Sequence, residues 1–280
     1  MKLFTSSLYI VSTPIGNLDD ITLRAIEVLK KSDVILCEDT RHSSKLLNHL
    51  KIKKKLISYH KFSEKKELVK AIKYLNEGKI LSLICDAGTP TLSDPGRIII
   101  EACIEKNIKI VPIPGVSSIT ASMSVSGFKD QFLFFGFLPK TEEKLDKILS
   151  SLCHLSFSQV FFVPAIKINF YLKKFKKFFF GRKILIAKEL TKLHESFYRD
   201  EIDKIIMFKT PIKGELTIVI SEKNIKDKTF DEMKMIKKAK LYLKKYSLKD
   251  VVELLFETEK INKKKIYQIC LNIKKNEKNY

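Results

Sequence analysis

The chain has 280 residues, of which 53 are Lys or Arg and 32 are Asp or Glu, giving a formal net charge of +21. Its length exceeds that of one typical domain, and 45% hydrophobic residues are enough for real cores. No apolar run of bilayer length is free of charges, and the apolar piece near the amino terminus is too short for a signal peptide. We therefore expect a cytoplasmic protein with no membrane partner.

Cysteine and histidine usage argues against a metal site. The five cysteines contain no C-x-x-C pair, and three of them sit in or beside apolar runs, as buried free thiols do. The five histidines form no metal-ligand spacing with them. We expect no bound metal.

The positive charge favours an anionic partner without identifying one. Neutralisation of phosphates by Lys and Arg is the usual basis of nucleic-acid binding. The excess here is almost entirely lysine, accompanied by abundant Ile, Asn and Phe, which is the pattern of a coding sequence drifting towards A and T. The net charge is therefore only supporting evidence.

The first predicted strand covers residues 8–11 and leads into the polar segment 12–20. A strand, a glycine turn and a helix in this order resemble a phosphate-binding loop, but a single glycine is not G-x-G-x-x-G. Asn17 or Asp19 is placed to cap the helix that follows. By itself this segment is a weak indication of nucleotide binding.

A second buried strand at 34–37 ends in charged and hydroxyl residues at 38–44. The pattern then predicts a strand at 55–58 and a helix at 64–77, which Gly78 ends. The polar cluster after the second strand is either a solvated loop or part of a site.

The apolar run 80–85 has the length and branching of a strand buried on both faces. It ends in Asp86, and a glycine-bearing loop follows. Asp94 is placed to cap, and Pro95 to open, a helix predicted at 96–106.

Three polar loops, at 12–20, 38–44 and 86–94, thus follow predicted parallel strands directly. Ligands of open α/β sheets bind at the carboxyl ends of the strands. An ordinary strand–loop–helix connection explains any one of these loops, but the three together indicate a ligand site.

After a strand at 108–113, Pro114 and Gly115 turn the chain, and small residues begin a helix at 117–126. A helix start made of Ser and Thr suits an anion or a carboxylate. A well-capped helix with a small-residue packing face is the plainer interpretation.

The pattern of predicted strands and helices changes after Gly127. Strands are predicted at 132–137, 160–163, 184–187 and 216–220, the last hairpin-like, with a charged helix and a Lys/Phe-rich helix at 166–178 between them. We interpret the chain as two α/β domains, residues 1–122 and 123–225, each a mixed sheet flanked by helices. A small helical module follows at 233–280.

Distinctive segments run through the whole chain. They are Y-I-V-S-T-P-I-G-N-L at 9–18, E-D-T-R at 38–41, D-A-G-T-P and S-D-P-G within 86–96, P-G at 114–115, F-G-F-L-P at 135–139, K-E-L-T-K at 188–192, G-E-L at 214–216, S-L-K at 247–249 and K-K-K-I-Y at 263–267. In this order they resemble the bacterial 16S ribosomal RNA (cytidine-2′-O)-methyltransferases, the ribosomal RNA small subunit methyltransferase I family. These have the two-domain tetrapyrrole-methylase fold of class III methyltransferases.

The resemblance implies a homodimer that binds S-adenosylmethionine in a cleft between the two α/β domains. The implied substrate is the 2′-hydroxyl of a decoding-centre cytidine in the 16S ribosomal RNA of the small ribosomal subunit. By family analogy the cofactor-binding residues are Pro14, Asp86, Ala87, Gly88, Ser117, Ser118 and Ala121.

Methyl transfer from a sulfonium is an in-line displacement that needs alignment and removal of the hydroxyl proton. Glu38 and Asp39, with Arg41, are the candidate catalytic residues. Arg24, Asn17 and Lys167 are the candidate substrate-binding residues, with Arg41 and Arg24 holding RNA phosphate. The alternative for the loop is that Glu38 and Arg41 pair with each other and only order it.

One segment departs from the family pattern. Where Tyr-Glu-Ser-x-x-Arg is usual after a strand, this chain has Phe162-Val163-Pro164-Ala165-Ile166-Lys167. Lys167 keeps the charge of the arginine but cannot make a bidentate contact. Either this motif is replaceable or the activity is reduced.

Two other functions fit the same fold. One is a methyltransferase that acts on a carbon of an anionic tetrapyrrole, and the other is a non-catalytic ribosome-binding factor whose site has decayed, as Val163 suggests. The E-D-T-R cluster and the basic carboxyl-terminal module favour RNA over a tetrapyrrole. The retained cofactor loops argue against a binding factor.

Overall fold

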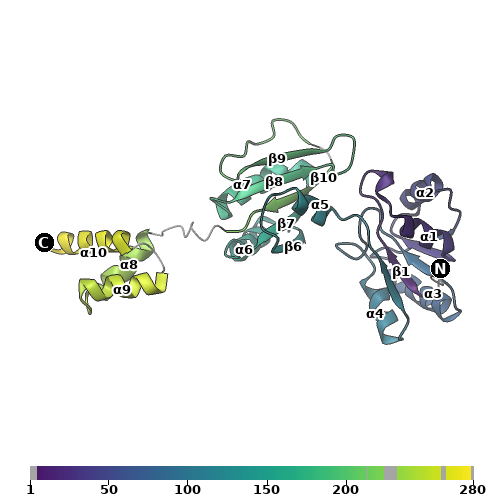
Figure 1. Cartoon of the computed structure of the whole chain (residues 1–280), viewed down its shortest axis with the longest axis horizontal. Coiled ribbons are helices and arrows are strands. Elements are labelled where there is room, and N and C mark those ends of the chain that lie inside the picture. Colours follow the sequence, from purple (N-terminus) through teal and green to yellow (C-terminus); the bar gives the residue numbers. More distant parts are fainter. Residues whose placement is uncertain (1–4, 213, 224–231, 260–262, 279–280) are drawn as a thin grey trace. The chain divides into compact units, whose positions relative to one another are not determined.

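A computed structural model describes residues 5–212, 214–223, 232–259 and 263–278. The chain divides into two compact units, Met1–Lys223 and Asn224–Tyr280 (Figure 1). The first unit contains two five-stranded sheets. The division of this unit at residue 122 stays a prediction.

The first sheet has the strand order β3-β2-β4-β1-β5. All pairings between its named strands are parallel, and one isolated antiparallel bridge joins Thr13 to Gly88. Every strand coincides with or lies inside a range that the sequence predicts. The strands are β1 (Leu8–Val11), β2 (Val34–Cys37), β3 (Lys55–Ser58), β4 (Leu81–Leu83) and β5 (Ile110–Ile113).

Helices cover both faces of this sheet, which is why its strands are apolar on both sides. Alternate residues of each strand point to opposite faces, so Leu8 packs with α3 and α4 while Tyr9 packs with α1 and α2. The elements are η1 (Leu18–Asp20), α1 (Leu23–Lys31), α2 (Thr40–His49), α3 (Glu64–Asn76) and α4 (Arg97–Glu105).

Two predicted helix starts are wrong. Thr22, not Asn17 or Asp19, caps α1 by accepting a hydrogen bond from the Ala25 amide at 3.1 Å, and Asn17 caps the short η1 instead. Helix α4 begins at Arg97 after Gly96, so neither Asp94 nor Pro95 opens it. Gly96 has φ +132° and lies against Leu83, a conformation that local sequence does not reveal.

The second sheet is mixed, with the order β6-β7-β10-β8-β9, in which only β6 and β7 are parallel. β10 lies between β7 and β8, so it is not half of a local hairpin. β9 was not predicted, because its run S-F-Y-R-D-E is mostly polar and exposed at the sheet edge. The strands are β6 (Phe132–Phe137), β7 (Ser158–Pro164), β8 (Lys183–Lys188), β9 (Ser196–Glu201) and β10 (Glu215–Ile220).

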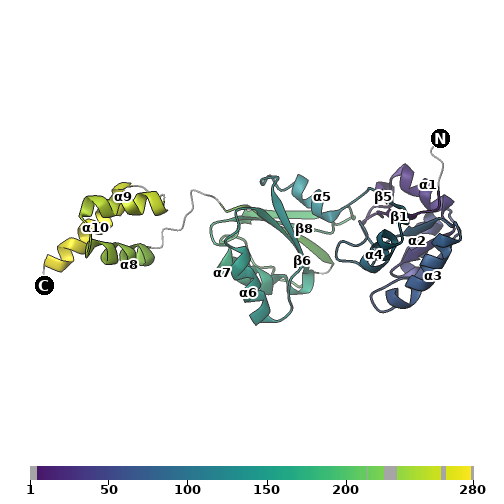
Figure 2. The same cartoon turned by 90° about the horizontal axis from the view of Figure 1, so that it is seen from below.

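One face of this sheet packs against two helices and the other against a single one (Figure 2). Leu145, Leu172 and Phe175 belong to the larger core on the first face. Ile119 packs with Val160 on the opposite face, leaving part of that face free to line a site. The elements are α5 (Ser118–Ser124), α6 (Glu142–Leu152), η2 (Ala165–Lys167) and α7 (Ile168–Phe178).

The described residues of the second unit form three helices, in line with the helical module that the sequence predicts. Its own core includes Met235, Ala239, Val251, Leu255 and Ile266. The helices are α8 (Glu232–Leu243), α9 (Leu248–Glu259) and α10 (Lys263–Lys278).

All five cysteines are free thiols. Over the described ranges, no helix is long and apolar enough to cross a membrane. Within the same ranges, no group of three His, Cys, Asp or Glu side chains is placed to hold a metal ion.

Candidate functional site

A cavity of about 430 Å³ lies where the carboxyl ends of the first sheet meet the second sheet. Loops after β1, β2, β4 and β5 contribute to it, together with β6, β7, β8 and β10 and the segments next to them. The residues that line it are Ile15, Glu38, Asp86, Ala87, Gly88, Thr89, Leu92, Ser93, Asp94, Ser117, Ser118, Ile119, Phe137, Phe162, Val163, Pro164, Ala187, Glu189, Leu190, Lys192, Gly214, Glu215, Leu216 and Thr217.

The loop after β4 is fixed to the loop after β1. Thr13 and Gly88 exchange two backbone hydrogen bonds, at 2.8 and 3.0 Å, and the Thr13 hydroxyl donates to the Cys85 carbonyl at 3.1 Å. Gly88 has φ +81°, and a Cβ there would lie 3.3 Å from Cγ2 of Ile15. A glycine is therefore needed for the backbone to pass this close to the cavity wall.

Asp86 connects this loop to the one after β2. Its Oδ1 accepts a hydrogen bond from the Asp39 backbone amide at 3.2 Å. Thr89 extends the same network, because its hydroxyl lies 3.1 Å from the Ser12 hydroxyl and donates to the Val116 carbonyl at 3.2 Å. The polar loops that the sequence places after separate strands thus form one connected wall.

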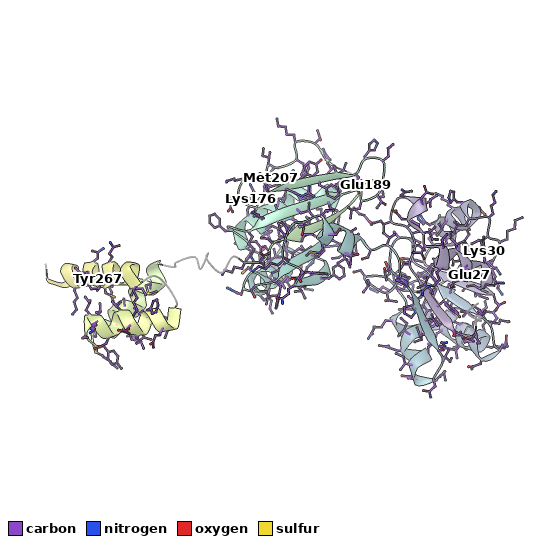
Figure 3. The ribbon with its side chains drawn as sticks, in the orientation of Figure 1. Glu27, Lys30, Lys176, Glu189, Met207 and Tyr267 are labelled. Carbon is purple, nitrogen blue, oxygen red and sulfur yellow. The ribbon has the colours of Figure 1, made fainter. Side chains whose placement is uncertain are left out.

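The second sheet closes the cavity from the opposite side. Glu189, labelled in Figure 3, follows β8 directly, and its Oε1 lies 3.1 Å from Nζ of Lys192. Gly136 lies at a bulge in β6, where a Cβ would come within 3.1 Å of the Ser93 hydroxyl. The Asn17 amide donates to the Thr191 hydroxyl at 3.0 Å, which holds the two walls together.

The two walls contain strained backbone. Thr91, Ser93, Glu189 and Thr191 all have positive φ, between 52° and 74°, although none is a glycine. Such conformations cost about 1–3 kcal/mol each and persist where the surrounding structure demands them. Their gathering on the two loops that face each other across the cavity supports a functional role for it.

The cavity is acidic. Among the lining residues that the structure describes, five are carboxylates (Glu38, Asp86, Asp94, Glu189 and Glu215) and one, Lys192, is an ammonium. Burial, aided by the charge of Glu38, raises the pKa of Asp94 to about 6. Burial also raises the pKa of Glu38, and the nearby Asp86 adds to this effect while His60 opposes it. Such a site attracts a cationic ligand and contains carboxylates suited to accept a proton near neutral pH.

The structure brings six of the predicted site residues together. Glu38, Asp86, Ala87, Gly88, Ser117 and Ser118 all line the cavity. Pro14 instead lines a separate hollow of about 30 Å³, to which Asp86 also contributes. Ala121 lies one turn further along α5 and is not part of the cavity lining.

Asp39 and Arg41 lie outside the cavity and bind each other. Asp39 caps α2, and its carboxylate accepts hydrogen bonds from the Arg41 amide at 2.8 Å and from Nη2 at 2.7 Å. These bonds hold the pKa of Asp39 well below its usual range. The alternative that Glu38 pairs with Arg41 is wrong, because Asp39 is the partner of Arg41.

The candidate substrate-binding residues lie at the surface and none of them lines the cavity. Arg24 donates to the Pro112 carbonyl at 3.2 Å. Asn17 caps η1, and Lys167 ends η2. Their assignment to substrate binding stays a prediction.

Three acidic residues of the cavity were not among the predicted site residues. The sequence predicts Asp94 as a helix cap, within a loop (86–94) that it also indicates as part of a ligand site. Glu189 and Glu215 come from the second sheet, in the segments K-E-L-T-K and G-E-L that carry the family resemblance. Those motifs are the available indication in the sequence, but nothing local shows that these two residues line the same cavity as Glu38.

The departure from the family pattern also maps to this site. Phe162, Val163 and Pro164 line the cavity, so the missing glutamate and serine belong to its wall. Val163 is only 1% exposed and packs in the larger core of the second sheet. Val163 therefore serves as an apolar core residue at the position where the family pattern has a glutamate.

Comparison with known proteins agrees with this architecture. Residues 7–206 match the family model described as Tetrapyrrole (Corrin/Porphyrin) Methylases. The chain is 42% identical over 270 residues to Ribosomal RNA small subunit methyltransferase I of Rickettsia prowazekii, covering 94% of this chain and 96% of that protein. It is 40% identical over 220 residues to the protein of the same name from Thermotoga maritima, covering 77% of this chain and 98% of that protein.

A solved structure shares the fold at low sequence identity. Uroporphyrin-III C-methyl transferase from Thermus thermophilus, complexed with S-adenyl homocysteine, aligns with a TM-score of 0.53 and 16% identity, covering 77% of this chain and 97% of that one. Fold, family model and relatives thus agree. The chain belongs to the ribosomal RNA small subunit methyltransferase I family and has its tetrapyrrole-methylase fold.

Proposed function

We propose that this chain transfers a methyl group from S-adenosylmethionine to the 2′-hydroxyl of a decoding-centre cytidine in 16S ribosomal RNA. The observation that carries the proposal is the acidic cavity between the two sheets, which Glu38 and the loop after β4 both line. The family supplies the substrate class, since relatives matched across nearly the whole chain are named for methylation of small-subunit ribosomal RNA.

The residues present fit S-adenosylmethionine. A volume of about 430 Å³ is within the range of small-molecule sites, and Gly88 leaves room at the wall that a side chain would fill. The excess of carboxylates suits a sulfonium and an ammonium group. Asp86, Ala87, Gly88, Ser117 and Ser118 would hold the cofactor. When bound, it supplies a methyl electrophile on a positively charged sulfur.

Glu38 is the proposed general base. A ribose hydroxyl is a poor acid, so its oxygen attacks efficiently only if its proton leaves as the new O–C bond forms and the C–S bond breaks. The Glu38 carboxylate takes that proton, and its raised pKa makes it a stronger base than an exposed glutamate. Such assistance is worth roughly 10²–10⁴-fold in rate.

Asp39 and Arg41 have a different part. The Asp39 amide orients Asp86, and the Asp39 carboxylate fixes the Arg41 guanidinium, whose side chain is 88% exposed. We assign Arg41 and Arg24 to contacts with RNA phosphate, where a guanidinium is well suited. Asn17 and Lys167 are proposed to contact the substrate as well.

The proposal extends to the biological context. We propose that the substrate is the RNA within the small ribosomal subunit and that the chain acts as a homodimer in the cytoplasm. These points rest on the family resemblance. Methylation of a tetrapyrrole is less well supported, because the tetrapyrrole enzyme shares 16% identity and shows the fold alone.

The direct test is to incubate the full-length protein with labelled S-adenosylmethionine and small ribosomal subunits lacking the modification, and then to map the label. We expect label on one cytidine 2′-oxygen. Absence of label while the protein still binds the cofactor would reject the proposal and favour a non-catalytic binding factor. Label on tetrapyrrole substrates instead would reject it in favour of the tetrapyrrole reaction.

A further inference from the structure

Helix α8 and the turn after it have a face made of lysines. Lys237, Lys240 and Lys244 follow one another at i, i+3 and i+7, so they lie on one side of the helix, and all three are exposed. Met235 and Ala239, on the other side, are buried in the core of the second unit. That core fixes which side faces the solvent.

Among the side chains that the structure describes, no carboxylate pairs with this face. Residues 235–249 contain six lysines and no Asp or Glu. The next acids along the chain have other partners, since Asp250 accepts from the Ser247 hydroxyl at 2.6 Å and Glu253 pairs with Lys263 at 2.8 Å. In the described part of the chain, Lys237, Lys240 and Lys244 take part in no ion pair.

The acidic cavity of the first unit is poorly suited to bind an RNA backbone, so a basic surface elsewhere would have to supply affinity. The described lining of the cavity holds five carboxylates and one lysine, a charge balance that disfavours a polyanion. Affinity for an RNA backbone must therefore come from cations outside the cavity. Lysines that are free of carboxylate partners release counterions when they meet phosphates, which is the main source of nucleic-acid affinity.

We propose that the face formed by Lys237, Lys240 and Lys244 binds the phosphate backbone of the RNA substrate and contributes affinity rather than chemistry. The inference rests on the proposed function for the identity of the RNA. Sequence is not read by this face, because lysine–phosphate contacts position a nucleic acid without recognising its bases.

The test compares two full-length triple variants with equal charge change. The first is Lys237→Gln, Lys240→Gln and Lys244→Gln. The control is Lys53→Gln, Lys106→Gln and Lys109→Gln, three exposed lysines just before β3 or at the α4–β5 connection, at the end of the first sheet opposite the cavity. Binding of 16S ribosomal RNA is measured from about 50 to 200 mM salt, a range in which phosphate contacts change affinity strongly.

We expect the slope of log K against log salt, which is negative, to be about 2–3 less steep for the α8 variant, corresponding to three lost phosphate contacts. S-adenosylmethionine binding and kcat at saturating RNA should stay unchanged, while KM for RNA rises at least ten-fold. The control variant should behave like the parent protein. An equal loss in both variants, or no loss in the α8 variant, would overturn the inference.

This outcome is separable from the proposed function. If the parent protein binds RNA through α8 but transfers no methyl group, the proposed reaction fails and the binding face stands. If methyl transfer is intact and RNA binding ignores α8, the binding face fails alone. Melting curves of all variants would check that the exposed substitutions leave the fold intact.

Discussion

The Asp86 carboxylate accepts a hydrogen bond from the Asp39 backbone amide at 3.2 Å, across the loops that follow the adjacent strands β4 and β2. This bond ties the proposed cofactor loop to the segment that carries Glu38. The proposed base is therefore held next to the cofactor wall by the backbone of its own neighbour. Four predictions follow from this arrangement and from the burial of the carboxylates around it.

Glu38→Gln should abolish most of the activity while leaving the site intact. Glutamine keeps the size of the side chain but cannot accept the hydroxyl proton, so we expect kcat to fall by roughly 10²–10⁴-fold. S-adenosylmethionine affinity, measured by calorimetry, should change little. Asp39→Asn is the matched control, since Asp39 lies outside the cavity, and it should lower kcat far less. A loss of kcat in Asp39→Asn as large as that in Glu38→Gln would contradict the assignment of Glu38 as the base.

The pH dependence of kcat should show an acid limb set by Glu38. Only the ionised carboxylate accepts a proton, and burial raises its pKa above the ordinary value of 4.5. The rate should thus fall as the pH drops through this raised pKa, with a midpoint clearly above 4.5. The residual activity of Glu38→Gln should lack this limb. A limb unchanged in that variant would mean that another group titrates.

Asp94→Asn should stabilise the protein near neutral pH. The pKa of Asp94 is about 6 in the folded chain against 3.8 for the free group, so the native state holds the extra proton between these values. Stability therefore falls as pH rises through that window, and the ionised group costs on the order of 1 kcal/mol above it, after allowance for solvent screening.

Melting temperatures at pH 7.5 and pH 4 check the Asp94 prediction. Asn should raise the melting temperature at pH 7.5 and have little effect at pH 4, where the aspartate is already protonated when folded. Asp130→Asn, at an exposed site outside the cavity, should change neither value. A destabilising Asp94→Asn at pH 7.5 would show that the charge is stabilised by a contact.

Gly88→Ala should weaken cofactor binding beyond its effect on stability. Gly88 has φ +81°, and the added Cβ would lie 3.3 Å from Ile15 in the cavity wall. Gly78→Ala provides the control, because Gly78 has φ +83° but nothing within 4 Å of the added atom.

Both alanine variants should lose about 1 kcal/mol of unfolding free energy through backbone strain. Only Gly88→Ala should then reduce S-adenosylmethionine affinity, by several-fold in a calorimetric titration. Unaltered affinity in Gly88→Ala would remove this wall from the proposed cofactor site.

Much of the site could be predicted from the chain order of apolar and polar residues. Runs such as residues 34–37 and 80–85 are buried strands, and polar residues directly after parallel strands gather at one edge of the sheet. This pattern indicates the loops at 38–44 and 86–94 as part of a ligand site, and Glu38, Asp86 and Gly88 of these loops, which the family resemblance implies as site residues, line the cavity. The motifs in the same loops support the resemblance to one particular family.

Other parts depended on contacts between distant segments. The edge strand β9 is so polar that its sequence does not indicate a strand. The place of β10 between β7 and β8 belongs to the order of the mixed sheet, which local sequence does not contain. The partner of Arg41 was set by the geometry of the α2 cap, where Asp39 accepts from both its amide and its guanidinium. Local spacing favours neither pairing over the other.

The fold class, the family and the loops that carry the chemistry can be predicted from the amino-acid order, because hydrophobic patterning and motif order are properties of neighbouring residues. Which carboxylates share the cavity depends on how the two sheets fold against each other. Glu189 and Glu215 reach it from the second sheet, and Asp94 has a pKa of about 6 because segments far apart in the chain exclude water from it. Desolvation is a property of the assembled walls, so no stretch of sequence contains it.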